Sequence, residues 1–171
     1  MIPENRLRVF NQGKGSGECV LYWMISARRT KWNHGLQHAI DLANERNLPL
    51  VVVEALASAH QWANDRSHTF VIQGMMDNKK ALEDSPITYI PYVETKPYEA
   101  GGLLEKWMEH ADALVIDDFP VYMPRRISEI AVSLDKCEVH CVDSNGFISM
   151  RQDRDFTTAY SLRRHLHKTI I

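Results

Sequence analysis

Several features that define other classes of protein are missing from this chain of 171 residues. It has only three cysteines, Cys19, Cys137 and Cys141, without regular spacing, which argues against a disulfide scaffold and for a reducing compartment. No apolar run approaches the length of a membrane span, and residues 1–17 lack the apolar core of an export signal. The net charge of -2 provides no general attraction to nucleic acid or to anionic membranes. We therefore expect a cytoplasmic protein with no membrane partner.

Motifs of several ligand-binding and enzyme classes are missing as well. Residues 11–17 contain three glycines, but these precede the first expected strand and lack the Lys-Ser/Thr ending of a phosphate loop. We therefore interpret residues 1–17 as a flexible lead-in. His34 and His38 lie one helical turn apart, yet Gly35 replaces the glutamate of the zinc-protease motif and no third ligand is evident. We expect solvent-facing histidines and no metal. A Gly-x-Ser-x-Gly elbow is also missing, so a hydrolase triad has no support.

What the chain does have is a regular alternation of apolar segments with helical patterns. The first segment, Cys19–Met24, is apolar on both faces, as a central parallel strand is. Leu36, Ala39, Ile40 and Ala43 then form one apolar helical stripe. Further strands are expected near residues 50–55, 87–90, 113–116 and 138–142, and helices near residues 31–46 and from about residues 68, 101, 124 and 157. The pattern predicts a single α/β domain over residues 18–171, with a five-stranded parallel, doubly wound (Rossmann-like) sheet of order 3-2-1-4-5 and helices on both faces.

Three segments match a known family in their order and spacing. They are Val20-Leu21-Tyr22-Trp23-Met24 followed by Arg29, Asn33 and Leu36; Leu114-Val115-Ile116-Asp117-Asp118-Phe119; and Cys141-Val142-Asp143-Ser144-Asn145 followed by Tyr160-Ser161-Leu162-Arg163. Together they resemble the amino-terminal, antenna-binding domain of the DNA photolyase/cryptochrome family, and most closely the class II cyclobutane pyrimidine dimer photolyases. The resemblance covers nearly all of residues 18–170. Two positions depart from the pattern: Ser26 replaces an arginine and Trp32 replaces an aspartate.

The resemblance implies a division of labour between two domains. In the family, a helical domain that follows this one binds FAD and the damaged DNA, and it repairs pyrimidine dimers by light-driven electron transfer. That helical domain is not part of this sequence, so we expect the chain to lack the lyase chemistry and to contact DNA only through such a domain. The resemblance implies that this part binds an antenna pigment, a deazaflavin or a folate. The expected partners are a helical flavin domain or a second copy of the chain on the same face.

Residues with polar, aromatic and apolar side chains gather where the expected strands end. In parallel sheets, ligands bind beyond these carboxyl ends, and a planar pigment needs apolar walls with a few donors and acceptors. An arginine supplies the donors and aspartates supply acceptors. The alternative is that Arg29 and Asp117 only pair with each other and cap loops. The candidate cofactor-binding residues are Met24, Ser26, Arg29 and Asn33 after the first strand, Glu54 and Leu56 at the end of the second, and Asp117, Asp118 and Phe119 at the end of the fourth.

Two other functions remain open from the sequence. A stand-alone nucleotide-binding protein of the universal-stress type has the same kind of sheet, but residues 118–122 contain no glycine where that type has a phosphate loop. A docking module without a ligand is the second alternative. The basic residues 163–168 suit either nucleic acid phosphate or, as we expect, the solvated face of a helix that buries Leu162 and Leu166. The four tryptophans, Trp23, Trp32, Trp62 and Trp107, are expected in the core or the pocket.

Overall fold

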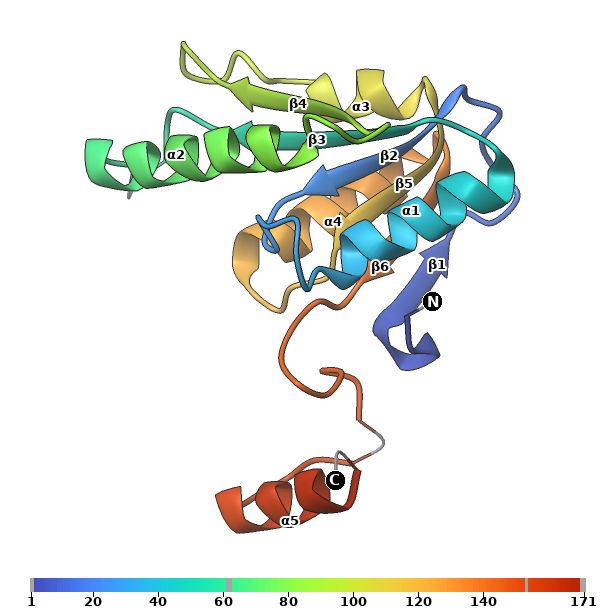
Figure 1. The fold of residues 1–171 in the computed structure, drawn as a ribbon, viewed down its shortest axis with the longest axis vertical. Helices are drawn as coiled ribbons and strands as arrows, with labels where there is room; N and C mark the ends of the chain where they lie inside the picture. Colours follow the sequence, from blue (N-terminus) through green and yellow to red (C-terminus); the bar gives the residue numbers. More distant parts are fainter. Residues whose placement is uncertain (1, 61–62, 153, 170–171) are drawn as a thin grey trace.

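The computed structural model describes residues 2–60, 63–152 and 154–169, and in this part the chain forms one six-stranded sheet flanked by helices (Figure 1). The order in the sheet is β1-β6-β5-β2-β3-β4. The strands are β1 (Leu7–Phe10), β2 (Cys19–Met24), β3 (Leu50–Leu56), β4 (Thr88–Val93), β5 (Ala111–Asp117) and β6 (Glu138–Val142). The helices are η1 (Glu4–Arg6, a 3-10 turn), α1 (His34–Arg46), α2 (Asp65–Leu82), α3 (Leu103–Met108), α4 (Tyr122–Leu134) and α5 (Ala159–Thr169).

The predicted α/β fold and strand order are confirmed for the five parallel strands. The order β4-β3-β2-β5-β6 is the expected 3-2-1-4-5 arrangement. Strand β2 lies at its centre, where Val20, Tyr22 and Met24 point into one apolar layer and Leu21 and Trp23 into the other. Helices α1 and α2 cover the first layer, and α3 and α4 cover the second (Figure 1). The switch point of the sheet therefore falls between β2 and β5.

The expected count of five strands is wrong, because a sixth strand lies within the expected flexible lead-in. Strand β1 pairs antiparallel with β6, with Arg8 opposite Cys141 and Phe10 opposite Val139. Arg6 is buried just before it and donates hydrogen bonds to carbonyl oxygens of residues 143, 145 and 146. These partners lie about 140 residues away along the chain, so the local sequence of the four-residue strand β1 does not reveal what it pairs with.

Several element boundaries differ from the expected ones, and for two of them the structure shows a physical reason. Helix α1 begins at His34 rather than near residue 31, because Asn33 is its N-cap and its side-chain oxygen accepts a hydrogen bond from the backbone N–H of Leu36 at 2.9 Å. Strand β4 continues through Pro91 to Val93, beyond the expected end at residue 90. A proline is tolerated there because β4 is an edge strand, where one side of the backbone makes no ladder hydrogen bonds.

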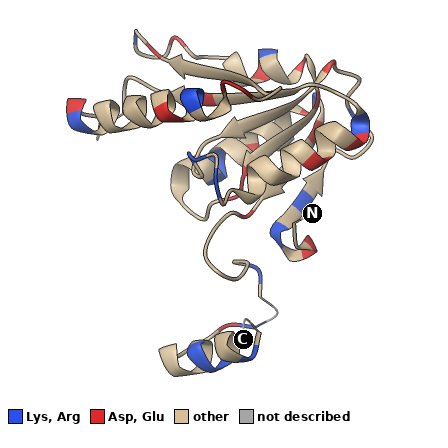
Figure 2. Cartoon of the chain, in the orientation of Figure 1, with Lys and Arg blue, Asp and Glu red and all other residues tan. Residues whose placement is uncertain are grey.

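Helix α5 stands apart from the body of the domain (Figure 1). None of its described residues is buried, so the expected burial of Leu162 and Leu166 is wrong. Residues of both charge signs are spread over the body of the domain (Figure 2), as the net charge of -2 suggests. No described helix combines the length and apolar character that crossing a membrane requires.

His38 on α1 and His140 on β6 form a contact that the sequence did not predict. The two rings approach to 2.8 Å between Nε2 of His38 and Nδ1 of His140. Burial, followed by the charge of His140, lowers the pKa of His38 to about 4, and burial also lowers the pKa of His140. The expectation that His38 faces solvent is therefore wrong. Within the described residues, no cluster of three or more His, Cys, Asp or Glu side chains could hold a metal.

These lowered pKa values predict a loss of stability in mild acid. Because the unfolded chain binds protons on histidine near pH 6.5 and the folded chain does not, stability falls as pH drops from 6.5 towards 4. Because His38 is partly exposed, we expect the free energy of unfolding to fall by about 1 kcal/mol over this pH range. Urea unfolding at several pH values measures it. His38→Gln should reduce the dependence of the free energy of unfolding on pH, whereas His110→Gln, at an exposed position, should not. An equal pH dependence in both variants would contradict the assignment of this effect to the histidine pair.

Candidate functional site

Asp117, at the end of β5, organises the loop that follows β2. One carboxylate oxygen accepts hydrogen bonds from the backbone N–H groups of Ile25, Ser26 and Ala27, at 3.0, 2.6 and 2.9 Å. The other oxygen accepts from the hydroxyl of Tyr22 at 2.8 Å. Burial, together with the Asp117 charge, raises the pKa of Tyr22 well above its usual value, so its hydroxyl remains a donor. The carboxylate therefore uses its acceptor positions inside the fold.

Asn33 and Arg29 hold the far end of the same loop. The Asn33 amide donates to the carbonyl oxygens of Ala27 and Arg29, at 2.9 and 3.0 Å. The Arg29 guanidinium donates to the carbonyl oxygen of Trp32. Among the described residues no ion pair between Arg29 and Asp117 is seen, so the alternative that these two residues pair is wrong, whereas loop capping by Asp117 is confirmed.

Glu54, a candidate ligand-binding residue, is instead the buried centre of a polar cluster. Its carboxylate accepts from Arg28 at 3.0 Å, from the Asn78 amide at 2.9 Å and from the Tyr89 hydroxyl at 2.6 Å. Arg28 also donates to the carbonyl oxygens of Ile25 and Ala55. Burial and then this hydrogen bond raise the pKa of Tyr89. The cluster links the β2 loop to β3, α2 and β4.

The candidate residues consequently divide among separate environments. Met24 and Glu54 are enclosed in the interior, and Leu56 is half-buried at the end of β3. Ser26, Arg29, Asp117, Asp118 and Phe119 surround a hollow of about 60 Å³ with Ser144 and Asn145. That volume holds a few water molecules but not a deazaflavin or a folate. The Ser26 hydroxyl is buried there without a hydrogen-bond partner among the described residues.

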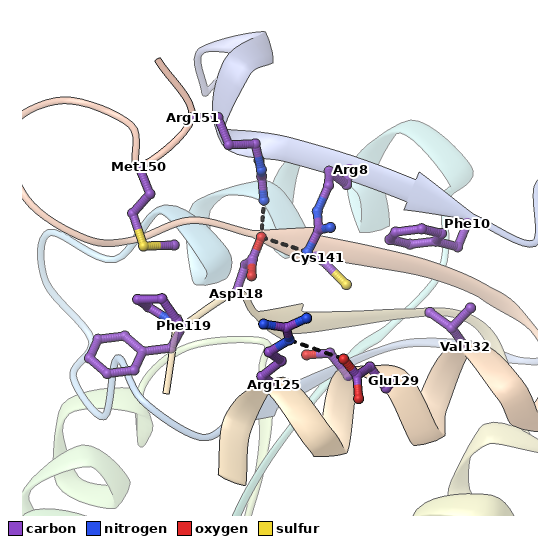
Figure 3. Close-up of a pocket in the computed structure, with 12 residues that line it drawn as sticks. Arg8, Phe10, Asp118, Phe119, Arg125, Glu129, Val132, Cys141, Met150 and Arg151 are labelled. Atoms are coloured by element: carbon purple, nitrogen blue, oxygen red, sulfur yellow. Dashed lines mark hydrogen bonds and ion pairs between the residues drawn. The ribbon is translucent and has the colours of Figure 1, made fainter. Parts of the chain in front are cut away.

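A ligand-sized cavity of about 550 Å³ lies on the other side of Asp118 and Phe119 (Figure 3). It opens between strands β1 and β6, helix α4 and the segment after β6. Burial raises the pKa of the Cys141 thiol in its lining to about 11, so the thiol is neutral there. The lining residues are Arg8, Phe10, Asp118, Phe119, Pro120, Arg125, Ser128, Glu129, Val132, Cys141, Met150 and Arg151.

The cavity combines apolar walls with an excess of basic groups. Asp118 pairs with Arg8 at 3.0 Å and with Arg151, and Arg125 pairs with Glu129 at 3.0 Å (Figure 3). Three arginines therefore face two carboxylates, which leaves one positive charge in excess. Flat apolar groups fit against the aromatic and thioether walls, while the guanidinium N–H groups are suited to carboxylate or phosphate oxygens.

Sequence reasoning missed most of this cavity, since only Asp118 and Phe119 were among the candidates. Arg8 and Phe10 belong to β1, which lies within the segment that the sequence predicts to be flexible. Their alternation with Leu7 and Val9 was the available signal, because residues two apart on a strand share a face. Arg125 and Arg151 lie eight and nine residues after the ends of β5 and β6. The sequence pattern does not show that segments so far from the strand ends fold back to line one cavity.

Comparison with known proteins points to one enzyme family. No model of a protein family matches the chain. The chain is 34% identical over 119 residues to a deoxyribodipyrimidine photo-lyase of Methanothermobacter thermautotrophicus, and 30% identical over 134 residues to one of Arabidopsis thaliana. These alignments cover 68% and 77% of this chain but only 26% of each relative, so the chain spans about a quarter of their length.

Solved structures are similar to the chain in fold alone. The universal stress protein from Archaeoglobus fulgidus matches with a TM-score of 0.51 at 14% identity, over 73% of this chain and 98% of that protein. The structural match confirms a shared α/β architecture. At 14% sequence identity it says nothing of a shared ligand. The sequence matches, by contrast, cover more than two thirds of the chain, and they support a relation between this chain and the deoxyribodipyrimidine photolyases.

Proposed function

We propose that this chain is the antenna-binding α/β domain of a photolyase-type system, closest to the class II enzymes. In this proposal it binds a deazaflavin or folate pigment and passes excitation energy to a flavin in a helical partner domain, which repairs pyrimidine dimers in DNA. The observation that carries the proposal is the 34% identity to a photolyase over 68% of the chain. The partner domain, rather than this chain, supplies FAD, the contact with the dimer and the lyase chemistry.

The cavity beside Asp118 is the site we propose for the pigment. Its volume of about 550 Å³ lies within the range of roughly 300–1,000 Å³ that is usual for small-molecule sites. Phe10, Phe119 and Met150 provide walls for a fused ring (Figure 3). Arg125 lies at the mouth with its Nε bonded to Glu129, and the guanidinium has further N–H groups that suit the acidic tail of such a pigment.

Arg125→Gln should weaken pigment binding about tenfold, since a charge-assisted hydrogen bond contributes roughly 1.5–3 kcal/mol. Fluorescence titration with a deazaflavin and with a folate measures the dissociation constant, which we expect in the micromolar range or below. Arg126→Gln is the matched control, because Arg126 is exposed on the same helix and bonds Tyr122 outside the cavity.

A third variant separates the cavity from the hollow at the β2 loop. Arg29 lines the hollow of about 60 Å³ and not the large cavity. If Arg29→Ala weakens binding while Arg125→Gln does not, the pigment lies beyond β2 and the proposed cavity is wrong. If neither pigment binds the unaltered chain, the antenna function itself is wrong.

The universal-stress alternative has less support than the photolyase proposal. The chain shares its fold with a universal stress protein. Residues 118–122, which follow β5, contain no glycine, however, so their backbone is not suited to a close approach to a phosphate group. The nucleotide alternative requires that ATP raise the melting temperature of the chain by mass action. An unchanged melting temperature in millimolar ATP would exclude it.

A further inference from the structure

Trp32 is displayed on the surface in a conformation that costs free energy. Its side chain is 91% exposed, although the sequence suggested a core or pocket position. Its backbone has φ of 55°, in the left-handed region that bulky residues rarely adopt. An exposed indole on a strained backbone gains nothing for stability, and such a combination is typical of a functional surface.

The loop of residues 25–33 holds Trp32 rigidly. Asp117 fixes the beginning of this loop through three backbone N–H groups, and Asn33 fixes its end as the cap of α1. The Arg29 guanidinium donates to the Trp32 carbonyl oxygen from Nε and Nη2, at 3.2 and 3.1 Å. Because these bonds order the loop in advance, little conformational entropy remains to be lost when the indole engages a partner.

A groove of about 230 Å³ lies beside the indole. Its apolar side is formed by Trp32, Leu36 and Ile40, and its polar side by Thr30, His34 and Gln37, with Asn33 at the base. Burial lowers the pKa of His34, so its ring is neutral at pH 7 and offers one donor and one acceptor. The groove is thus of a size and polarity for one flat heterocycle whose edge forms hydrogen bonds.

The charges around the groove favour an anion next to that heterocycle. The loop contains Arg28, Arg29 and Lys31 and no acidic residue. Arg28 is neutralised by Glu54, which leaves the exposed Arg29 and Lys31 at the surface. The positive end of the α1 dipole lies at the same place, because α1 begins at His34.

We propose that Trp32 and this groove bind a base of single-stranded nucleic acid, with the adjoining backbone phosphate held at Arg29 and Lys31. A stacking aromatic next to basic side chains is the arrangement that single-strand binding requires. The proposal adds a nucleic acid contact on the α/β domain itself and is independent of the pigment cavity, which shares none of its lining residues with the groove.

Fluorescence anisotropy with a labelled oligothymidine of twelve nucleotides tests the stacking contact in the full chain. Trp32→Ala should weaken binding about tenfold, whereas Trp32→Phe, which keeps an aromatic face, should stay within about threefold of the unaltered chain. Phe147→Ala is the matched control, because Phe147 is 90% exposed but lies outside the groove. Trp32 is on the surface, so circular dichroism should show these variants folded.

Salt dependence and competing ligands test the rest of the proposal. Lys31→Gln should reduce the slope of log K against log salt concentration by about 0.7, the value for one phosphate contact on a single strand. Equal affinity of Trp32→Ala and the unaltered chain would overturn the proposal. So would no binding at 50 mM salt, or equal affinity for thymidine monophosphate or for duplex DNA. Pigment binding is measured separately, so failure here leaves the antenna proposal untouched.

Discussion

Asp117→Ala is expected to lower the free energy of unfolding by about 4 kcal/mol. Asp117 is 2% exposed and accepts hydrogen bonds from the Tyr22 hydroxyl and from the backbone N–H groups of residues 25–27. A hydrogen bond to a charged group contributes roughly 1.5–3 kcal/mol, and the donors left behind would be partly buried without partners. For a chain of this size that loss corresponds to a fall in melting temperature of about 8–16 °C.

The neighbouring residue provides the control for this experiment. Asp118 pairs in the cavity lining with Arg8 and Arg151, whose side chains are 48% and 30% exposed, so solvent weakens both interactions and Asp118→Ala should cost no more than about 1 kcal/mol. Denaturant unfolding of both variants gives the comparison. Equal losses for the two aspartates would show that Asp117 does not hold the β2 loop in the manner the hydrogen bonds indicate.

Arg28→Ala is expected to cost about 3 kcal/mol, close to the effect of Asp117→Ala. Glu54 is 1% exposed, and removing its cationic partner leaves a buried carboxylate whose remaining donors in the described part of the chain, Asn78 and Tyr89, are neutral. Breaking a buried ion pair from one side typically costs 3–5 kcal/mol, and Arg28 is partly exposed, which places it at the low end. Thermal or urea unfolding measures the loss.

Two further variants show whether the loss comes from the ion pair. Arg29→Ala removes the adjacent arginine, which is exposed and bonded to a backbone carbonyl, and should change stability by no more than about 0.5 kcal/mol. Adding Glu54→Gln to Arg28→Ala should recover part of the stability, because the carboxylate charge is then gone. If the double variant is less stable than Arg28→Ala by the full effect of Glu54→Gln, the two residues are not coupled.

The sheet was predictable because its central strands are apolar on both faces. Residues 20–24 and 113–116 have no charged side chain to face water, and the alternation of such segments with helices fixes a parallel order. Strand β1 was not predictable in the same way. It has four residues, one of them charged, and its pairing with β6 depends on contacts made far along the chain.

The site was predictable in position but not in content. Strand ends located Asp117, Asp118 and Glu54 correctly, yet position alone does not show whether a carboxylate faces a ligand or the interior. Two adjacent arginines illustrate the same limit. Arg28 turns inward to Glu54 and Arg29 stays exposed, and only the three-dimensional path of the loop decides between them. Trp62, expected in the core or pocket, lies outside the described residues.

A crystal structure of the chain grown with a deazaflavin, and another with a folate, tests the antenna proposal most directly. We expect the fused ring of one of these pigments between Phe119 and Met150, with its acidic tail at Arg125. Pigment density at the hollow beside Ser26 and Arg29 would contradict the assignment of the cavity. An empty cavity at millimolar concentrations of both pigments would contradict the antenna function as a whole.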